Sequence, residues 1–364
     1  MCGSVSVLYI LIGILMFGVL IAVHEFGHFG TAKLFGIKVN EFSIGMGPTL
    51  FKRQRGETQY SLRALPFGGF CAIEGEDGSS DDPRSFTTKP LWQRLIVMVA
   101  GAGMNILIGF LITLILYFIS ACSGNYVVGD ATLSGFMEGF PLEGENGLMA
   151  GDRITAVNGW GVNNPRDLTV FLSLEGGETV DLTLRREGKK VVLRDLPLVK
   201  RTYTDPATGE EGLYYGLYFR QLALTPGIAL RESWYDCQYY VRMVWLSLRY
   251  LLTGRAGVKD LSGPVGLVKA MGDAGSEADT VGEGLTNVFG LVAFIAVNLG
   301  VVNLLPIPAL DGGHVFSMLV FALIGLILRR KPDPRIESYI HGGGLVLLLI
   351  LMAYVLFNDV VKLF

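Results

Sequence analysis

Two histidines and a glutamate stand at the end of the first apolar stretch of the sequence. His24, Glu25 and His28 form the pattern His-Glu-x-x-His. On a helix, positions i and i+4 share one face, so both imidazoles can reach a single metal ion. Zinc binds neutral histidine nitrogens at about 2.0–2.1 Å, and Glu25 would stand beside any water on that metal. The pattern therefore predicts a zinc site with a carboxylate next to it.

A catalytic zinc site needs a third protein ligand and one open position for water. Asp311 is the preferred candidate, because it interrupts an otherwise uncharged apolar stretch, where an unpaired carboxylate costs about 2.5–3.5 kcal/mol. A divalent cation would remove that cost. Asp311 could instead cap the helix that follows Gly312 and Gly313. His341 is a weaker candidate for the third ligand, and His314 is expected to be structural or to lie behind the ligands.

The stretch before Asp311 cannot be one continuous helix. Pro306 and Pro308 lack backbone donors and fix φ, so the helix must break there. Irregular backbone at membrane depth survives only where it lines a polar cavity or is buried in protein. We expect an unwound segment beside the metal that also contacts substrate. The amides of Asn298 and Asn303 could hydrogen-bond a substrate backbone, or could equally join neighbouring helices.

Long apolar runs must hold these residues within a lipid bilayer. Of the 364 residues, 51% are hydrophobic and 17% are charged, against about a quarter charged in soluble domains. The mean hydropathy is +0.46. About 20 apolar residues span the hydrocarbon layer as a helix, and the sequence offers four such runs. We predict a polytopic α-helical membrane protein whose transmembrane helices lie within 4–36, 91–121, 286–328 and 340–360.

The charge and the cysteines exclude other classes of protein. The net charge is −3 and no basic face is present, which argues against nucleic-acid binding. The four cysteines are scattered singly, so they fit neither a Cys-x-x-Cys metal site nor a disulfide framework. The first apolar run has no basic flank and leads directly into His24, which excludes a cleaved signal peptide.

Basic residues near the ends of the runs predict the orientation. Eight lysines and arginines lie between residues 33 and 89, and Arg329, Arg330, Lys331 and Arg335 lie between the third and fourth runs. Because cytoplasmic loops carry the excess of Lys and Arg, both of these loops belong in the cytoplasm. Both termini and the long segment 122–285 are then extracytoplasmic.

Three segments outside the runs have their own patterns. Residues 37–90 predict a membrane-associated β region with a hairpin around Gly56, whose free edge could hold an extended partner near Gly68 and Gly69. A loop that merely covers the helix bundle is the alternative. Residues 122–200 alternate at period two around tight turns and predict a small β-rich domain. Residues 201–285 read as a linker with an amphipathic helix lying at the membrane surface.

Several motifs together resemble the site-2 protease family of intramembrane zinc metalloproteases (peptidase family M50), and most closely its bacterial RseP-like branch. The resemblance rests on the first histidine motif, on Asn303-x-x-Pro-x-Pro-x-Leu-Asp-Gly-Gly-His314, and on Pro66–Phe70 and Ser262–Gly266. Residues 147–162 resemble part of a PDZ domain. The family pattern Ala-Gly-Pro-x-x-Asn reads Ala100-Gly-Ala-Gly-Met-Asn105 here. That difference puts a helix bend at this point in doubt, and only one PDZ domain fits into 122–200.

The resemblance implies one zinc ion held by His24, His28 and Asp311, with Glu25 as the general base. It implies residence in the bacterial inner membrane and cleavage of single-span substrates, such as anti-sigma factors or remnant signal peptides. Another protease would trim these substrates first on the extracytoplasmic side. The PDZ-like domain would exclude bulky substrates, bind a newly exposed C-terminus, or act as a plain spacer. Alternatives are a catalytically silent PDZ-bearing scaffold, against which Glu25 counts, and a cation transporter, against which the gathering of polar residues at one depth counts.

Overall fold

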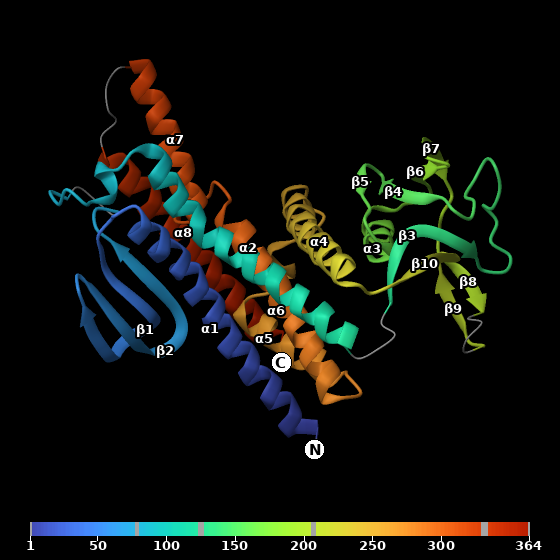
Figure 1. Cartoon of the computed structure of the whole chain (residues 1–364), viewed down its shortest axis with the longest axis horizontal. Coiled ribbons are helices and arrows are strands. Elements are labelled where there is room, and N and C mark those ends of the chain that lie inside the picture. The colour runs from blue at the N-terminus through green and yellow to red at the C-terminus, as the bar shows by residue number, and fades with distance from the viewer. Residues whose placement is uncertain (1, 77–79, 123–126, 205–208, 329–333, 363–364) are drawn as a thin grey trace. The chain divides into compact units, whose positions relative to one another are not determined.

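The computed structural model describes the chain except for residues 1, 77–79, 123–126, 205–208, 329–333 and 363–364 (Figure 1). The basic residues 329–331 that contributed to the predicted orientation lie outside the described residues. Two compact units make up the chain. We call Met1–Leu116 with Asp236–Phe364 the helical unit, and Tyr117–Tyr235 the β unit.

Four helices in the described part of the chain are long and apolar enough to cross a membrane. They are α1 (Cys2–Leu34), α2 (Leu91–Cys122), α6 (Val281–Asn303) and α8 (Pro334–Val361). The apolar helix α7 (Asp311–Leu328) is shorter and follows α6 after a break. The protein is therefore a multi-pass membrane protein, as the hydropathy predicted.

The third predicted span begins earlier in the structure than expected, and its expected break divides it into α6 and α7. It was expected to run from 286 to 328, but α6 begins at Val281 and ends at Asn303. The earlier start follows from an N-cap, in which the Thr280 side chain accepts a hydrogen bond from the Glu283 backbone N–H at 3.2 Å. The predicted break is present, and the chain is non-helical over 304–310 before α7 starts at Asp311.

Small residues bring α1, α2 and α6 into backbone contact. A Cβ atom at Gly27 would lie within 3.0 Å of backbone atoms of Ala100 and Gly101, so α1 touches α2 at the depth of the histidine motif. A Cβ at Gly300 would come equally close to the carbonyl oxygen of Ala102. Close approach at glycines is a common way for helices to pack in membranes. With alanine in place of the family's proline, α2 runs unbroken through Ala102.

A short helix, α5 (Pro264–Ser276), packs beside α1 and α6. Met271 of α5 joins Tyr9 and Leu20 of α1 in one buried apolar cluster with α6. The first turn of α5 is capped by another helix, because the carboxylate of Asp359 on α8 accepts hydrogen bonds from the N–H groups of Gly263 and Gly266, at 3.1 and 2.8 Å. Those N–H groups have no partner within α5 itself.

The expected amphipathic helix is α4 (Pro226–Leu252), and part of its apolar surface packs against α6. Cys237, Tyr240 and Val244 form a buried cluster with residues of α6 such as Ala293 and Val297. The sequence predicts that this helix lies at the membrane surface, and that location stays a prediction. Trp234 and Trp245 of α4 are exposed, whereas the buried residues of the same helix contact α6. An apolar pattern alone does not distinguish a lipid surface from a neighbouring helix.

Strands β1 (Val39–Arg55) and β2 (Thr58–Ile73) form a two-stranded antiparallel sheet that packs against α1 (Figure 1). The hairpin predicted around Gly56 is present, with 49–55 paired to 58–63. Residues 41–44 have partners on both sides, namely 69–72 on one and 59–62 on the other. The sheet therefore folds back on itself, and the last part of β2 forms an edge.

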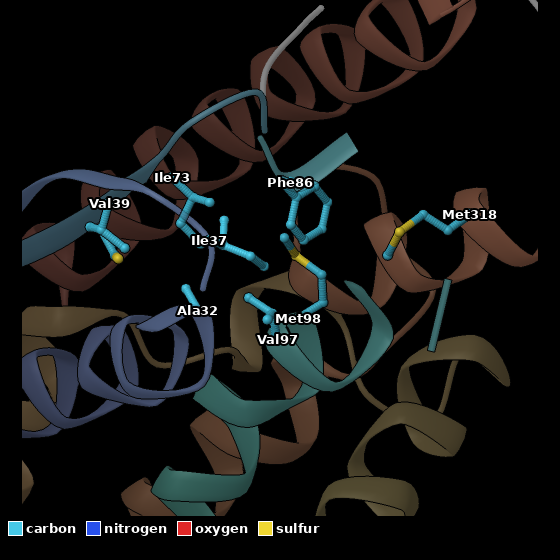
Figure 2. Close-up of a cluster of buried hydrophobic side chains, with 9 residues drawn as sticks. Ala32, Ile37, Val39, Ile73, Phe86, Val97, Met98 and Met318 are labelled. Atoms are coloured by element: carbon cyan, nitrogen blue, oxygen red, sulfur yellow. The ribbon is translucent and has the colours of Figure 1, made fainter. Parts of the chain in front are cut away.

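A buried apolar cluster ties this sheet to the helices, as Figure 2 shows. Its labelled members are Ala32, Ile37, Val39, Ile73, Phe86, Val97, Met98 and Met318, and Cys71 completes it. These residues come from α1, both strands, the turn η1 (Phe86–Thr88), α2 and α7. Because α1, α2 and α7 also carry the candidate metal-binding residues and their neighbours, this cluster fixes the spacing of the elements that form the site.

The β unit is built on one six-stranded sheet. Its order is β10-β3-β4-β6-β7, with β5 paired to β4. The strands are β3 (Val127–Phe136), β4 (Arg153–Val157), β5 (Trp160–Gly161), β6 (Val180–Arg186), β7 (Lys189–Leu196) and β10 (Leu217–Ala223), and α3 (Pro165–Glu175) accompanies them. A separate pair joins β8 (Arg201–Thr204) to β9 (Glu211–Tyr214). The two hairpin turns predicted at Asn158-Gly159 and Glu187-Gly188 are present.

The β unit extends past residue 200, where the sequence placed a linker. β10 pairs antiparallel with β3, from Leu217 opposite Phe136 to Ala223 opposite Val127. A buried carboxylate stabilises this pairing, since Asp130 of β3 forms a salt bridge with Arg220 of β10. Burial raises the pKa of Asp130, but the hydrogen bond from Arg220 and the charge of Arg153 outweigh it, and the pKa lies below its ordinary value.

Candidate active site

Three ligand atoms from distant parts of the helical unit converge. The Nε2 atom of His24 lies 3.1 Å from Oδ2 of Asp311, and the Nε2 atom of His28 lies 3.4 Å from the same oxygen. The two Nε2 atoms are 3.3 Å apart. Both histidines are buried, with 7% of each exposed. The sequence-predicted pair on α1 and the carboxylate at the start of α7 therefore meet at one point.

The separations fit three corners of a tetrahedron. With metal–ligand bonds of about 2.0–2.1 Å, neighbouring ligand atoms in a tetrahedral zinc site are about 3.3–3.4 Å apart. The three observed separations run from 3.1 to 3.4 Å. The Oδ2 atom of Asp311 is also buried and has no hydrogen-bond partner within the described residues. A divalent cation among the three atoms would satisfy this oxygen, so the group fits a zinc ion.

The protonation of His28 is set by α2. Its Nδ1 lies 2.8 Å from the backbone carbonyl oxygen of Val97. Because a carbonyl only accepts hydrogen bonds, Nδ1 carries the proton and donates it, and Nε2 presents its lone pair to the other two groups. A backbone carbonyl behind a histidine is a usual way to orient a metal ligand.

His24 is held by Asn105 of α2, which is fully buried. The amide nitrogen of Asn105 lies 3.2 Å from Nδ1 of His24, while its Oδ1 is buried and has no hydrogen-bond partner in the described part of the chain. Turning the amide by half a turn exchanges the two atoms, which have the same shape. Oδ1 then accepts the Nδ1 proton of His24, and the lone pair of Nε2 is available to a metal. The amide of Asn303 lies 3.5 Å from that Nε2.

Glu25 is half-buried and touches the edge of the β sheet. Its carboxylate accepts a hydrogen bond from the backbone of Cys71 in β2. A Cβ atom at Gly69 would lie 3.5 Å from Cγ of Glu25, so the strand passes directly beside the carboxylate. Burial raises the pKa of the Cys71 thiol, and the charge of Glu25 raises it further. Cys71 is therefore a protonated structural residue and no nucleophile.

Of the residues predicted to bind substrate, some lie beside the converging ligands and others do not. Gly69 lies beside Glu25, whereas Gly68 packs against the side chain of Met46. Asn303 reaches His24, but Asn298, five residues earlier on α6, is half-buried and makes no side-chain hydrogen bond within the described residues. Pro306 is exposed.

The remaining candidates lie around the break. Pro308 packs against α8, where a Cβ at Gly344 would clash with it. The carboxylate of Asp311 faces the histidines, which does not favour a role in capping α7. His341 and His314 are not in the group of three converging ligands among the described residues. Their rings stack on each other, with the ring centroids 3.7 Å apart.

Comparison with known proteins identifies the family. The sequence model of the family described as "Peptidase family M50" matches residues 12–351. The chain belongs to peptidase family M50. A Clostridium acetobutylicum protein provisionally named a zinc metalloprotease is 36% identical over 363 residues, covering 97% of each chain. A Clostridium perfringens protein of the same description is 34% identical over 357 residues, covering 97% of this chain and 99% of its own length. The regulator of sigma-W protease RasP from Bacillus subtilis is 27% identical over 437 residues, which cover 96% of this chain and 98% of RasP.

The M50 protease is a zinc metalloprotease of the site-2 type and acts within the membrane. Sequence reasoning missed three of the contacts that orient its candidate metal-binding motif. Asn105 was noted only as part of a family pattern, and neither the Val97 carbonyl nor the Cys71 backbone was foreseen. Backbone groups carry no residue-type signal, so only the packing of α1 against α2 and β2 could have shown them.

Replacing Gly101 of the M50 protease by alanine is expected to weaken zinc binding. An added Cβ would lie within 3.0 Å of ring atoms of both His28 and His24, which have no room to move because α2 holds both rings from behind. We expect the zinc dissociation constant to rise about 10–100-fold, as for other changes that misorient metal ligands. Competition with a chromogenic chelator measures it.

Gly103→Ala is the matched control for this variant. It lies on the same helix, and no atom lies within 4 Å of the added Cβ. Both variants should retain the helix content of the wild type. Equal zinc affinities of the Gly101 and Gly103 variants would show that the rings are not confined by α2.

Proposed function

We propose that this M50 protease hydrolyses peptide bonds within or beside the transmembrane segments of single-span membrane proteins. In this proposal His24, His28 and Asp311 hold one zinc ion and Glu25 is the general base. The observation that supports it most directly is the convergence of the three ligand atoms, with Glu25 beside them, in a bundle of apolar helices. Ionisable residues in such a bundle are costly and are therefore functional by default.

Each residue of the group has one task in the proposed reaction. Zinc held by these residues would supply Lewis acidity that activates water and polarises a carbonyl group. Val97 and Asn105 keep the two imidazoles oriented with Nε2 toward the Asp311 carboxylate. Glu25 takes the proton of the attacking water on its carboxylate and returns it to the leaving amine. The hydrogen bond from the Cys71 backbone holds Glu25 in place for both transfers.

The substrate is proposed to bind as an extended strand along the edge of β2. A helical segment hides its carbonyl groups in its own hydrogen bonds, so it must unwind before it can be cleaved. Residues 69–72 pair with 41–44 on one side, while the other side is directed to α1 and Glu25. Addition of a strand to a free edge would align a peptide carbonyl with the site. Gly69 leaves space there, and the amides of Asn303 and Asn298 are the proposed partners for the substrate backbone.

The β unit is proposed to be a PDZ-like domain that screens substrates. It contains a cavity of about 490 Å³. The cavity is lined by residues of β3, β10 and the start of α3, among them Gly129, Pro165 and Phe219, together with Tyr117 of α2 and Glu232 of α4. An open cavity beside a strand favours binding of an extended segment, such as the C-terminus left by a first extracytoplasmic cleavage, over a role as a plain spacer.

The proposed location is the bacterial inner membrane, with both termini and the β unit on the extracytoplasmic side. The support is the concentration of basic residues in 33–89 and 329–335. This arrangement places the β unit where an upstream protease would act on the same substrates.

Cleavage of a single-span reporter by purified protein in lipid vesicles tests the proposed function. We expect cleavage inside or near the reporter's apolar segment, loss of cleavage with a membrane-permeant chelator, and recovery when zinc is added back. A bound zinc of about one per chain should accompany activity. A protein that binds the reporter and never cleaves it, with zinc present, would favour the silent scaffold.

A further inference from the structure

The break between α6 and α7 is a short irregular segment, 304–310, in which the N–H groups of Ile307 and Leu310 donate to the carbonyl groups of Leu305 and Ile307 at 2.7 and 3.1 Å. Pro306 and Pro308 have no backbone N–H to donate. Ala309 lies in the left-handed region with φ of +73°, which is strained for a residue other than glycine. This segment ends at Asp311, two residues later. Its conformation therefore decides where the carboxylate of Asp311 lies, and something outside the segment must stabilise it.

His341 of α8 supplies that stabilisation. The backbone N–H of Ala309 donates a hydrogen bond to Nδ1 of His341 at 3.1 Å. Because a backbone N–H can only donate, Nδ1 is unprotonated and the proton of the neutral ring is on Nε2. Nε2 lies 3.2 Å from Oγ of Ser317, the group to which it donates. One ring thus joins the strained residue before Asp311 to a buried residue of α7 after it.

Two neighbours keep the ring of His341 in this position. The ring of His314 stacks on it with an interplanar angle of 5°. A Cβ atom at Gly344 would clash with Pro308, so glycine at this position lets α8 approach the segment closely. His341 therefore contacts the segment and α7, and it is not one of the three converging groups found among the described residues.

We infer that His341 is a positioning residue for the third zinc ligand: its two hydrogen bonds hold the Ala309 turn and the first turns of α7, and thereby place the Asp311 carboxylate against His24 and His28. This inference rests on the proposed role of Asp311. His341 itself does not touch the metal or the substrate. Its loss should change the geometry and the affinity of the metal site.

Variants of His341 that keep one hydrogen bond at a time test the inference. An asparagine places a polar atom where Nδ1 stands and can still accept from Ala309. A glutamine places one where Nε2 stands and can still reach Ser317. A phenylalanine keeps the stacked ring and loses both bonds. The readouts are the zinc dissociation constant and the visible absorption of the Co²⁺-substituted protein, which reports the ligand geometry around the metal.

We expect His341→Phe to raise the zinc dissociation constant about 10–100-fold and to alter the Co²⁺ spectrum, as loss of an outer partner of a metal ligand does. His341→Asn should bind zinc about tenfold more tightly than His341→Gln, because the bond to Ala309 is the one that holds the turn. The comparison of these two polar variants carries the test even if the phenylalanine variant does not fold. Gly342→Ala is the control, since nothing lies within 4 Å of its added Cβ, and it should bind as the wild type does.

Measurement of Asp311→Asn beside these variants separates the two proposals. If Asp311→Asn loses zinc affinity while the asparagine and glutamine variants of His341 bind zinc equally and with the wild-type Co²⁺ spectrum, the inference is wrong and the ligand set stands. If Asp311→Asn itself binds zinc as the wild type does, the ligand set is wrong, and the inference falls with it.

Discussion

Glu25→Gln should abolish cleavage while leaving the zinc in place. Glutamine has the size of glutamate and can still accept the hydrogen bond from the Cys71 backbone, but it cannot take a proton from water. Loss of a general base reduces the rate about 10²–10⁴-fold. Zinc content should stay at about one per chain, because Glu25 is not among the three converging ligand atoms. The measurement is the initial rate of reporter cleavage, with metal content determined on the same sample.

The control for this variant is Glu178→Gln, which makes the same chemical change at an exposed position of the β unit. It should cleave at the wild-type rate. Wild-type cleavage by the Glu25 variant would mean that another group moves the proton, and the assignment of the base would be wrong. Loss of zinc from the variant would instead show that Glu25 contributes to metal binding.

Asp311→Asn is expected to weaken zinc binding at least about 100-fold, a larger effect than the loss of an outer partner. The change leaves two neutral imidazoles and an amide oxygen, which is a poorer ligand for a dication than a carboxylate. It also removes the only negative charge among the three converging groups of the described site. Chelator competition measures the dissociation constant, and cleavage should fall in parallel unless zinc is supplied in excess.

Asp359→Asn is the matched control for Asp311→Asn. Asp359 is also a buried aspartate of an apolar helix, but its carboxylate caps α5. Its replacement should lower the thermal stability, since hydrogen bonds to a charged group contribute about 1.5–3 kcal/mol. The zinc affinity should not change. If both aspartate variants lose zinc to the same degree, the effect is a general loosening of the bundle, and Asp311 is not a specific ligand.

Much of the helical unit could be predicted from the sequence because a bilayer restricts the choices. Uncharged runs long enough to span it must be helices, and the prolines at 306 and 308 must break one. The meeting of α1 with the start of α7 was expected because isolated ionisable residues in lipid need a partner. The ligand assignment itself stays a prediction, which the metal-binding experiments test.

The rest depended on packing that no single segment encodes. Asn105 faces His24 only because glycines let α1 and α2 touch, and the rotation of one helix about its axis cannot be deduced from its own residues. The apolar residues of α4 give the same sequence pattern whether they face a lipid surface or a neighbouring helix such as α6. The sequence places β10 in a linker because a short strand without regular alternation is recognisable only beside the strand with which it pairs.

The pairing of β10 with β3 has a consequence for how the β unit is attached. Val127, where β3 begins, is a direct neighbour of Ala223, where β10 ends. The Cα atoms of such cross-strand partners are about 4.5–5.5 Å apart. The first and last strands of the main sheet therefore begin and end side by side within the β unit. Residues 127–223 could be excised and the cut ends rejoined by a few glycines without stretching the chain, so family members could gain or lose such modules without redesign of the protease beneath.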